Sequence, residues 1–109
     1  MREFCIQIQP GLLKSFDEAS VDALCLASTF EAPIKDVAKT EGEDHGRYIN
    51  IYFKTQDPKT VWVALRERLM QRGLLDATIV TCTGEDGWND YLLLHHFDKQ
   101  YRTGEYRSL

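Results

Sequence analysis

Residues 47–54, Arg-Tyr-Ile-Asn-Ile-Tyr-Phe-Lys, constrain the fold more than any other stretch, because apolar and polar side chains alternate along their whole length. Strand side chains point to opposite faces with a period of two, so Ile49, Ile51 and Phe53 share one face. Two tyrosines, an amide and a lysine share the other. We therefore predict a strand that is buried on one face and carries an unusual aromatic and amide surface on the other.

Four other stretches have strand character. Residues 3–9 alternate cleanly and end at Pro10-Gly11, since proline lacks a donor and glycine frees the backbone. Residues 77–83 are rich in β-branched residues, and residues 91–97 are mostly apolar. Residues 34–41 are charge-rich, which suits an edge strand, and the glycine-bracketed turn 42–46 predicts a hairpin with the strand at 47–54.

Two helices are predicted between these strands. Ser15 and Glu18 have the spacing of a capping box, and apolar residues at helical spacing follow, which predicts a helix over about residues 16–29. The second helix is the more secure, because Asp57-Pro58 opens it and Gly73 closes it. A second apolar pair on that helix, Val63 and Met70, indicates packing against the neighbouring helix or a contact patch for another protein.

The resulting order is β-α-β-β-α-β followed by an additional C-terminal strand, which predicts an α+β fold. Two right-handed crossovers give a ferredoxin-like antiparallel sheet with both helices on one face. Residues 3–9 and 47–54 are then the two central strands, and the final strand extends the sheet beside 77–83. The 109 residues suit one domain over 1–97, with a polar tail over 98–109 that frays or folds over the sheet.

The net charge limits the classes of binding partner that we expect. The formal net charge is −4, whereas nucleic-acid-binding proteins usually show a basic excess on one face. We therefore expect a protein partner of basic character, with nucleic acid disfavoured. No apolar run approaches the length of a signal peptide core or a membrane span, so a cytoplasmic protein, bacterial in style, is expected.

The face of the sheet that points away from the helices is the first candidate surface. Its side chains are polar or aromatic, and RNA-recognition folds stack bases on aromatic residues at such positions. This chain lacks the glycines of that family's strand motif and is acidic, so a protein partner, a second copy or the tail is the favoured occupant. The residues of this open sheet face are Gln7, Gln9, Tyr48, Asn50 and Tyr52.

The acidic segment between the last two strands is the second candidate. It is predicted to be a loop over residues 84–90, with three carboxylates around one tryptophan, which fits an anchor and charged rim for a basic partner. The alternative is a solvated turn with the tryptophan folded over the edge of the core. Calcium binding is not expected, because the carboxylates do not alternate and no closing glutamate follows. The segment comprises Glu85, Asp86, Trp88, Asn89 and Asp90.

Leu92, Leu93 and Leu94 form the third candidate. Three consecutive leucines place apolar groups on both faces of a strand that is expected at a sheet edge, and such an edge invites pairing unless it is covered. We expect either the tail or a second chain to cover it, and homodimerisation through these leucines is the preferred consequence.

No catalytic or metal-binding arrangement is evident in the sequence. His95 and His96 point to opposite faces of a regular strand, so the two cannot bind one metal ion. A pair of Cys82 with a histidine lacks an orienting third group, and the three cysteines are expected to be free thiols. We expect no cofactor.

By elimination and charge, we favour a small non-catalytic interaction module, in the form of an acidic inhibitor or immunity-type protein. The alternative from another class is a dimeric domain that senses a small molecule or regulates through one. An enzyme or an RNA-binding module ranks below both.

Overall fold

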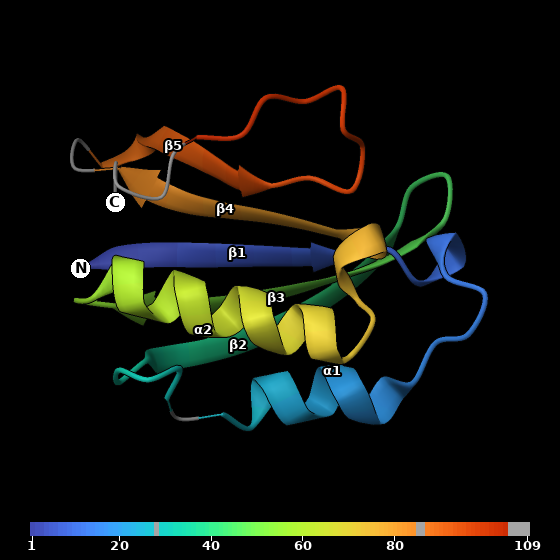
Figure 1. Ribbon diagram of the computed structural model, residues 1–109, viewed down its shortest axis with the longest axis horizontal. Helices are drawn as coiled ribbons and strands as arrows, with labels where there is room; N and C mark the ends of the chain where they lie inside the picture. Colours follow the sequence, from blue (N-terminus) through green and yellow to red (C-terminus); the bar gives the residue numbers. More distant parts are fainter. Residues whose placement is uncertain (28, 85–86, 105–109) are drawn as a thin grey trace.

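The computed structural model describes residues 1–27, 29–84 and 87–104, and within them five strands form one antiparallel sheet (Figure 1). The strand order is β2-β3-β1-β4-β5, so β1 and β3 lie inside the sheet and β5 extends it beside β4, as expected. The bounds of the strands are β1 Arg2–Ile8, β2 Lys35–Glu43, β3 Arg47–Thr55, β4 Thr78–Gly84 and β5 Gly87–His95.

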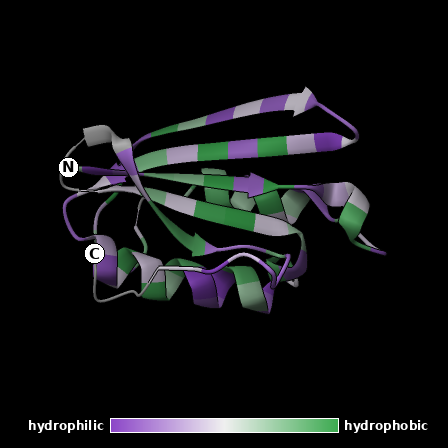
Figure 2. Ribbon diagram, turned by 90° about the horizontal axis from the view of Figure 1, so that it is seen from above, coloured by the Kyte–Doolittle hydropathy of each residue, from purple (hydrophilic) through white to green (hydrophobic). Residues whose placement is uncertain are grey.

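Alternation along the strands sets which face is buried, and Figure 2 shows the hydropathy changing sign from residue to residue. In the pairing of β1 with β3, Ile6 lies opposite Ile51 and Phe4 lies opposite Phe53, and all four side chains are buried. The buried face of the sheet packs against both helices, which Figure 1 shows in front of it. The prediction of an α+β fold with an antiparallel sheet and two helices is confirmed.

The first helix, α1, spans Glu18–Cys25 and is shorter than the predicted 16–29. The predicted capping box is wrong, because Asp17 is the N-cap and its Oδ1 accepts a hydrogen bond from the Ala19 N–H at 3.0 Å. Glu18 is then the first helical residue, and its carboxylate binds Arg47 instead of the backbone of Ser15. The helix ends before Leu26. The Leu26 side chain is 85% exposed, so it does not continue the buried apolar side of the helix.

The second helix, α2, spans Pro58–Gln71 and begins and ends close to the predicted residues. The side chain of Asp57 accepts a hydrogen bond from the Thr60 N–H, and Gly73 has the left-handed conformation with φ of 67°. Val63 and Met70 are both more than half exposed, so the alternative of packing against the neighbouring helix does not hold. The short 3-10 turns η1 Pro10–Leu12 and η2 Leu75–Ala77 complete the elements.

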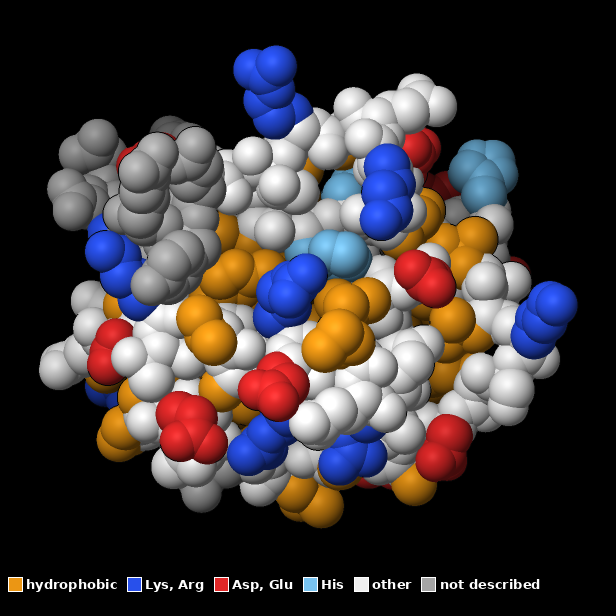
Figure 3. Space-filling model, in the orientation of Figure 1, with side chains coloured by type: hydrophobic (Ala, Val, Ile, Leu, Met, Phe, Trp, Pro, Cys, Tyr) orange, Lys and Arg blue, Asp and Glu red, His pale blue; other side chains and the backbone are white. Residues whose placement is uncertain are grey.

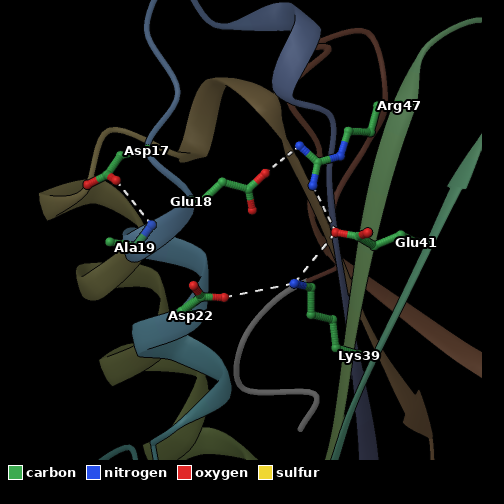
Figure 4. A network of polar contacts seen from close by, with 7 residues as sticks. All are labelled: Asp17, Glu18, Ala19, Asp22, Lys39, Glu41 and Arg47. Carbon is green, nitrogen blue, oxygen red and sulfur yellow. Dashed lines mark hydrogen bonds and ion pairs between the residues drawn. The ribbon is translucent and has the colours of Figure 1, made fainter.

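A chain of ion pairs fastens α1 to the hairpin of β2 and β3 (Figure 4). Arg47 bridges Glu18 on α1 and Glu41 on β2, and Lys39 bridges Glu41 and Asp22 on α1. The hydrogen bond from Arg47 holds the pKa of the Glu41 carboxyl below its usual value. These groups are exposed, so they orient the helix on the hairpin more than they stabilise the fold.

Candidate binding face of the sheet

The open sheet face carries the predicted side chains on the side that the helices leave uncovered. Cross-strand partners in an antiparallel sheet share a face, and Gln7 lies opposite Asn50 while Cys5 lies opposite Tyr52. These residues are half-buried, as are Gln9 and Tyr48. The predicted set of Gln7, Gln9, Tyr48, Asn50 and Tyr52 therefore comes together on one surface.

One end of this face is hollowed beside the turn that joins β2 to β3. The hollow has a volume of about 340 Å³. Its floor comes from β1, the residue that follows β1, and β3, and its wall comes from the turn residues Asp44, His45 and Gly46. We call it the turn hollow. The floor residues are Gln7, Gln9, Tyr48 and Asn50.

The turn gains its shape from two unusual backbone conformations. His45 has φ of 57° and Gly46 has φ of 138°, and the Asp44 N–H donates to the Gly46 carbonyl at 3.0 Å. Few residues other than glycine adopt such positive φ values at low cost. The sequence predicted the turn but not that the turn forms part of a site. The available signal was Gly46, a glycine directly before the strand that carries the two tyrosines.

The hollow is rich in hydrogen-bond acceptors. The Asn50 Oδ1 is buried and has no hydrogen-bond partner, which is unusual for a buried polar atom. The Gln7 Oε1 accepts one hydrogen bond, from the Gln9 Nε2 at 3.1 Å, and keeps capacity for another. The Asp44 carboxylate on the wall adds a negative charge. A ligand that donates hydrogen bonds and carries positive charge matches this lining.

Tyr48 lines the hollow, and its ring lies over the neighbouring strand β2. It lies opposite Gly42 on β2, and a Cβ at Gly42 would collide with the Tyr48 hydroxyl group. Because Gly42 has no side chain, the phenol ring of Tyr48 has room to lie over β2. Sequence reasoning treated Gly42 only as part of a turn and missed this close approach.

Replacing Gly42 by alanine is expected to displace the Tyr48 ring and to lower the free energy of unfolding by about 1 kcal/mol, because the added methyl overfills the site. Urea denaturation measures the loss, and the NMR signals of the Tyr48 ring report its movement. Gly11→Ala is the matched control, since a Cβ at Gly11 meets no atom within 4 Å. An unmoved Tyr48 ring in Gly42→Ala would contradict the assignment.

Tyr52 and Cys5 form the next step along the open sheet face. Burial raises the pKa of the Cys5 thiol, and its hydrogen bond with Tyr52 opposes that rise in part. Cys5 is therefore a neutral thiol at neutral pH and serves the face as a small, weakly polar group.

The acidic segment differs from its predicted form. β5 begins at Gly87, so Trp88, Asn89 and Asp90 belong to a strand and the prediction of a loop over 84–90 is wrong. Gly84 pairs with Gly87 there. The Asp90 carboxylate occupies the space beside Gly84, so residue 84 has no room for a Cβ. Glu85 and Asp86 lie outside the described residues, and the proposed role of the segment stays a prediction.

The joined ends of β2 and β3 and the paired glycine ends of β4 and β5 lie at opposite ends of the sheet. Gly84 and Gly87 close β4 and β5 near the N-terminus, whereas Glu43 and Arg47 close β2 and β3 at the far end (Figure 1). Glu43 and Asp44 therefore lie at the other end of the sheet from Gly84 and Gly87. Figure 3 shows acidic and basic side chains interspersed over the described part of the helix-bearing face.

The three leucines are divided between the faces of β5. Leu94 is buried and Leu92 packs against the core, whereas Leu93 lies opposite Thr81 on the open sheet face. The tail returns to this edge, because the Gly104 N–H donates to the Leu93 carbonyl at 2.6 Å. Of the two covers that the sequence left open, the described tail supplies at least part, and dimerisation through these leucines stays untested.

Cys82, His95 and His96 are held in ways that disfavour a nucleophilic cysteine–histidine pair. Burial raises the pKa of the Cys82 thiol to about 11, whereas a nucleophilic cysteine needs a lowered pKa. The ring of His95 binds the Leu75 carbonyl at 2.8 Å, and the ring of His96 stacks on Tyr101. Neither histidine is thus placed as a partner for Cys82.

The described residues form neither a metal-binding cluster nor a membrane-spanning helix. Residues 1–27, 29–84 and 87–104 contain no group of three His, Cys, Asp or Glu side chains that would hold a metal ion. None of the helices in this part of the chain has the length and apolar character needed to cross a membrane.

A second and larger hollow, of about 560 Å³, lies along the exposed side of α2. Its lining is mostly long, charged side chains such as Lys59, Glu67 and Arg68, with Val63 among them. The guanidinium group of Arg68 is already engaged over the Phe30 ring, with its central carbon 4.9 Å from the ring centroid. This hollow holds no buried polar atom without a partner among those the structure describes, so the turn hollow is the better-defined site.

Comparison with protein-family models, with curated proteins and with solved structures finds no match to the chain.

Proposed function

We propose that the protein is a non-catalytic interaction module that binds a basic protein partner, in the manner of an acidic inhibitor or immunity-type protein. The observation that carries the proposal is the turn hollow, an acceptor-rich recess whose Asn50 Oδ1 is buried without a partner. A buried acceptor that lacks a hydrogen bond costs about 1 to 3 kcal/mol, which a donor from a partner would recover.

An arginine or lysine side chain of the partner suits this recess. The guanidinium group offers five donors in a planar fork, and the lining offers the Asp44 carboxylate, the Gln7 Oε1 and the Asn50 Oδ1. The Asn50 oxygen is buried, and a rotation of the amide about χ2 on binding would turn it toward the hollow that the side chain lines. Tyr48 and Tyr52 add rigid aromatic area beside the recess, which is typical of binding surfaces.

We include a ferredoxin-like fold in the same proposal, and the strand topology supports it. The strand order β2-β3-β1-β4 agrees with a ferredoxin-like core, and β5 adds one strand to it beside β4. A sheet with both helices on one face leaves its other face for a partner. A cytoplasmic location belongs to the proposal as well.

The double variant Asp44→Asn and Asn50→Leu is expected to weaken partner binding by about tenfold or more, because it removes the charge and the acceptor that the basic side chain would meet. The partner is first captured from a lysate of the source cells by the immobilised wild-type protein and identified by mass spectrometry. The affinities of the purified wild-type and variant proteins for it are then compared by calorimetry.

Two control proteins sharpen this measurement. Glu67→Gln removes one exposed charge on α2 and is expected to leave affinity unchanged. The triple change Glu85→Gln, Asp86→Asn and Asp90→Asn tests the acidic segment at the other end of the sheet. If the triple variant loses the partner and the hollow variant keeps it, the partner binds the acidic segment and the turn hollow has no part.

The small-molecule alternative draws on the same hollow. Its volume lies near the lower end of ligand pockets, about 300 to 1,000 Å³, but its lining is polar where such pockets are mostly apolar. A thermal-shift screen of metabolites separates the two functions, since only a sensing domain is stabilised by a small molecule.

A further inference from the structure

The two edges of the sheet differ in what covers them. At the β5 edge the tail donates a backbone hydrogen bond to Leu93, whereas beyond β2 the described chain places no further strand. Eight of the nine residues of β2 are exposed, and Gly42 is half-exposed. An uncovered edge presents unpaired N–H and C=O groups and is a template for another strand.

A bulge restricts which part of β2 can serve as a template. The pairing with β3 shifts register between Lys35 and Ala38, and Asp36 has the left-handed conformation with φ of 56°. Bulges of this kind twist an edge away from further pairing. Beyond the bulge, residues 38–43 pair with β3 without interruption and form a regular edge.

A second copy of the chain is the occupant that the charges on this edge fit. When two copies pair antiparallel about a two-fold axis perpendicular to the sheet, the axis passes midway between one residue and its equivalent in the other copy. Centring on Lys39 places two lysines directly opposite each other, and centring on Gly42 places Glu41 opposite Glu43. Centring on Glu41 sets Lys39 opposite Glu43 but places two glutamates directly opposite each other at the axis. Centring on Thr40 places Lys39 opposite Glu41 twice.

The Thr40-centred register is also favourable sterically. It sets Thr40 opposite Thr40 and the small Ala38 opposite Gly42, and pairs of threonines and of opposite charges stabilise neighbouring strands. Lys39 and Glu41 lie opposite Ile51 and Ile49 of β3, so both point to the helix-bearing face. There they would extend the ion pairs with Asp22 and Arg47 from one copy into the next.

We propose that the protein forms a homodimer by antiparallel pairing of β2 with β2, centred on Thr40, so that the two sheets become one continuous sheet. The axis keeps both open sheet faces on the same side and places the two turn hollows on one extended surface. The dimer does not depend on the partner proposed above, and it uses the edge opposite to the three leucines.

Charge exchange tests the register. Wild-type protein is expected to show concentration-dependent dimers in sedimentation velocity, and Lys39→Glu is expected to weaken dimerisation about tenfold or more, because two unlike pairs become two like pairs. The double variant Lys39→Glu with Glu41→Lys restores unlike pairs and is expected to recover most of the affinity. Lys35→Glu, on the far side of the bulge, is the charge-matched control and is expected to dimerise like the wild type.

Cross-linking tests the same register without changing charge, and it carries the test if the exchanged variants do not fold. Directly opposite Cα atoms in an antiparallel pair are about 4.5 to 5.5 Å apart, within the range of a disulfide. Thr40→Cys is therefore expected to give a disulfide-linked dimer under mild oxidation, beyond any that wild-type Cys5 and Cys25 give. Glu43→Cys is the control, since its two copies would lie about 20 Å apart along the strands.

Three outcomes would overturn the proposal. A wild-type protein that stays monomeric at millimolar concentration has no such dimer. Dimers that Lys39→Glu leaves intact in a folded protein use another surface. Equal cross-linking of Thr40→Cys and Glu43→Cys excludes the register.

Discussion

Replacing Phe53 by alanine is expected to lower the free energy of unfolding by about 3 to 5 kcal/mol, the range for removing a large buried aromatic side chain. Phe53 is 1% exposed and lies at the middle of a stack. Its ring centroid lies 5.1 Å from that of Phe4 and 5.5 Å from that of Phe30. The stack therefore joins β1, β3 and the segment after α1, and its outer member Phe30 meets Arg68 of α2.

The loss would remove a large share of the total stability, since domains of this kind are stable by only about 5 to 15 kcal/mol. Urea denaturation followed by circular dichroism measures it. Val63→Ala serves as the control, because Val63 is 55% exposed on α2 and its replacement should change stability by no more than about 0.5 kcal/mol. A loss below about 1.5 kcal/mol for Phe53→Ala would mean that the stack is not part of the core.

The elements that the sequence predicted well are those in which local and tertiary preferences agree. Alternation along residues 47–54 requires one buried face, and the strand register with β1 uses that same face. At α2, the cap residue, the proline and the closing glycine act within the helix itself, so they hold whatever packs against it. Both elements were placed to within one or two residues.

Two elements depended on partners that are distant in the sequence. Glu18 was expected to complete a capping box, but Arg47, 29 residues away, binds its carboxylate. Trp88, Asn89 and Asp90 follow two glycines and acidic residues, which locally favours a loop, yet they lie within β5 because Gly87 and Tyr91 on either side of them pair with β4. A local sequence pattern does not report the energy gained from contacts with distant residues.

The candidate site was likewise predicted in part. The period of two was sufficient to place Gln7, Gln9, Tyr48, Asn50 and Tyr52 on one face. The hollow itself arises because a three-residue turn rises beside that face, and the height of a turn depends on the φ values of His45 and Gly46. The close fit of Tyr48 over Gly42 depends on strand register, which the sequence does not specify residue by residue.

The second large effect is expected at Thr55, where valine should lower the free energy of unfolding by about 2 kcal/mol although the side chain keeps its shape. Thr55 is 1% exposed, and its hydroxyl donates to the Pro33 carbonyl at 3.1 Å. The same oxygen accepts a hydrogen bond from the Asp57 N–H at 3.1 Å. One hydroxyl thus joins the end of β3 to the segment before β2 and to the N-cap of α2.

Valine leaves both backbone groups without this partner, whereas Thr55→Ser removes only a methyl group and keeps both hydrogen bonds. Urea denaturation should therefore rank serine above valine in stability. The exchange rates of backbone amide hydrogens provide a second measurement, and a simple packing defect would not produce the expected result. The amides of the first turn of α2 should exchange faster in the valine variant alone, because the residue that caps them has lost its own anchor. Equal exchange in both variants, or a valine variant more stable than the serine variant, would show that packing of the methyl group, and not the hydroxyl, holds this junction together.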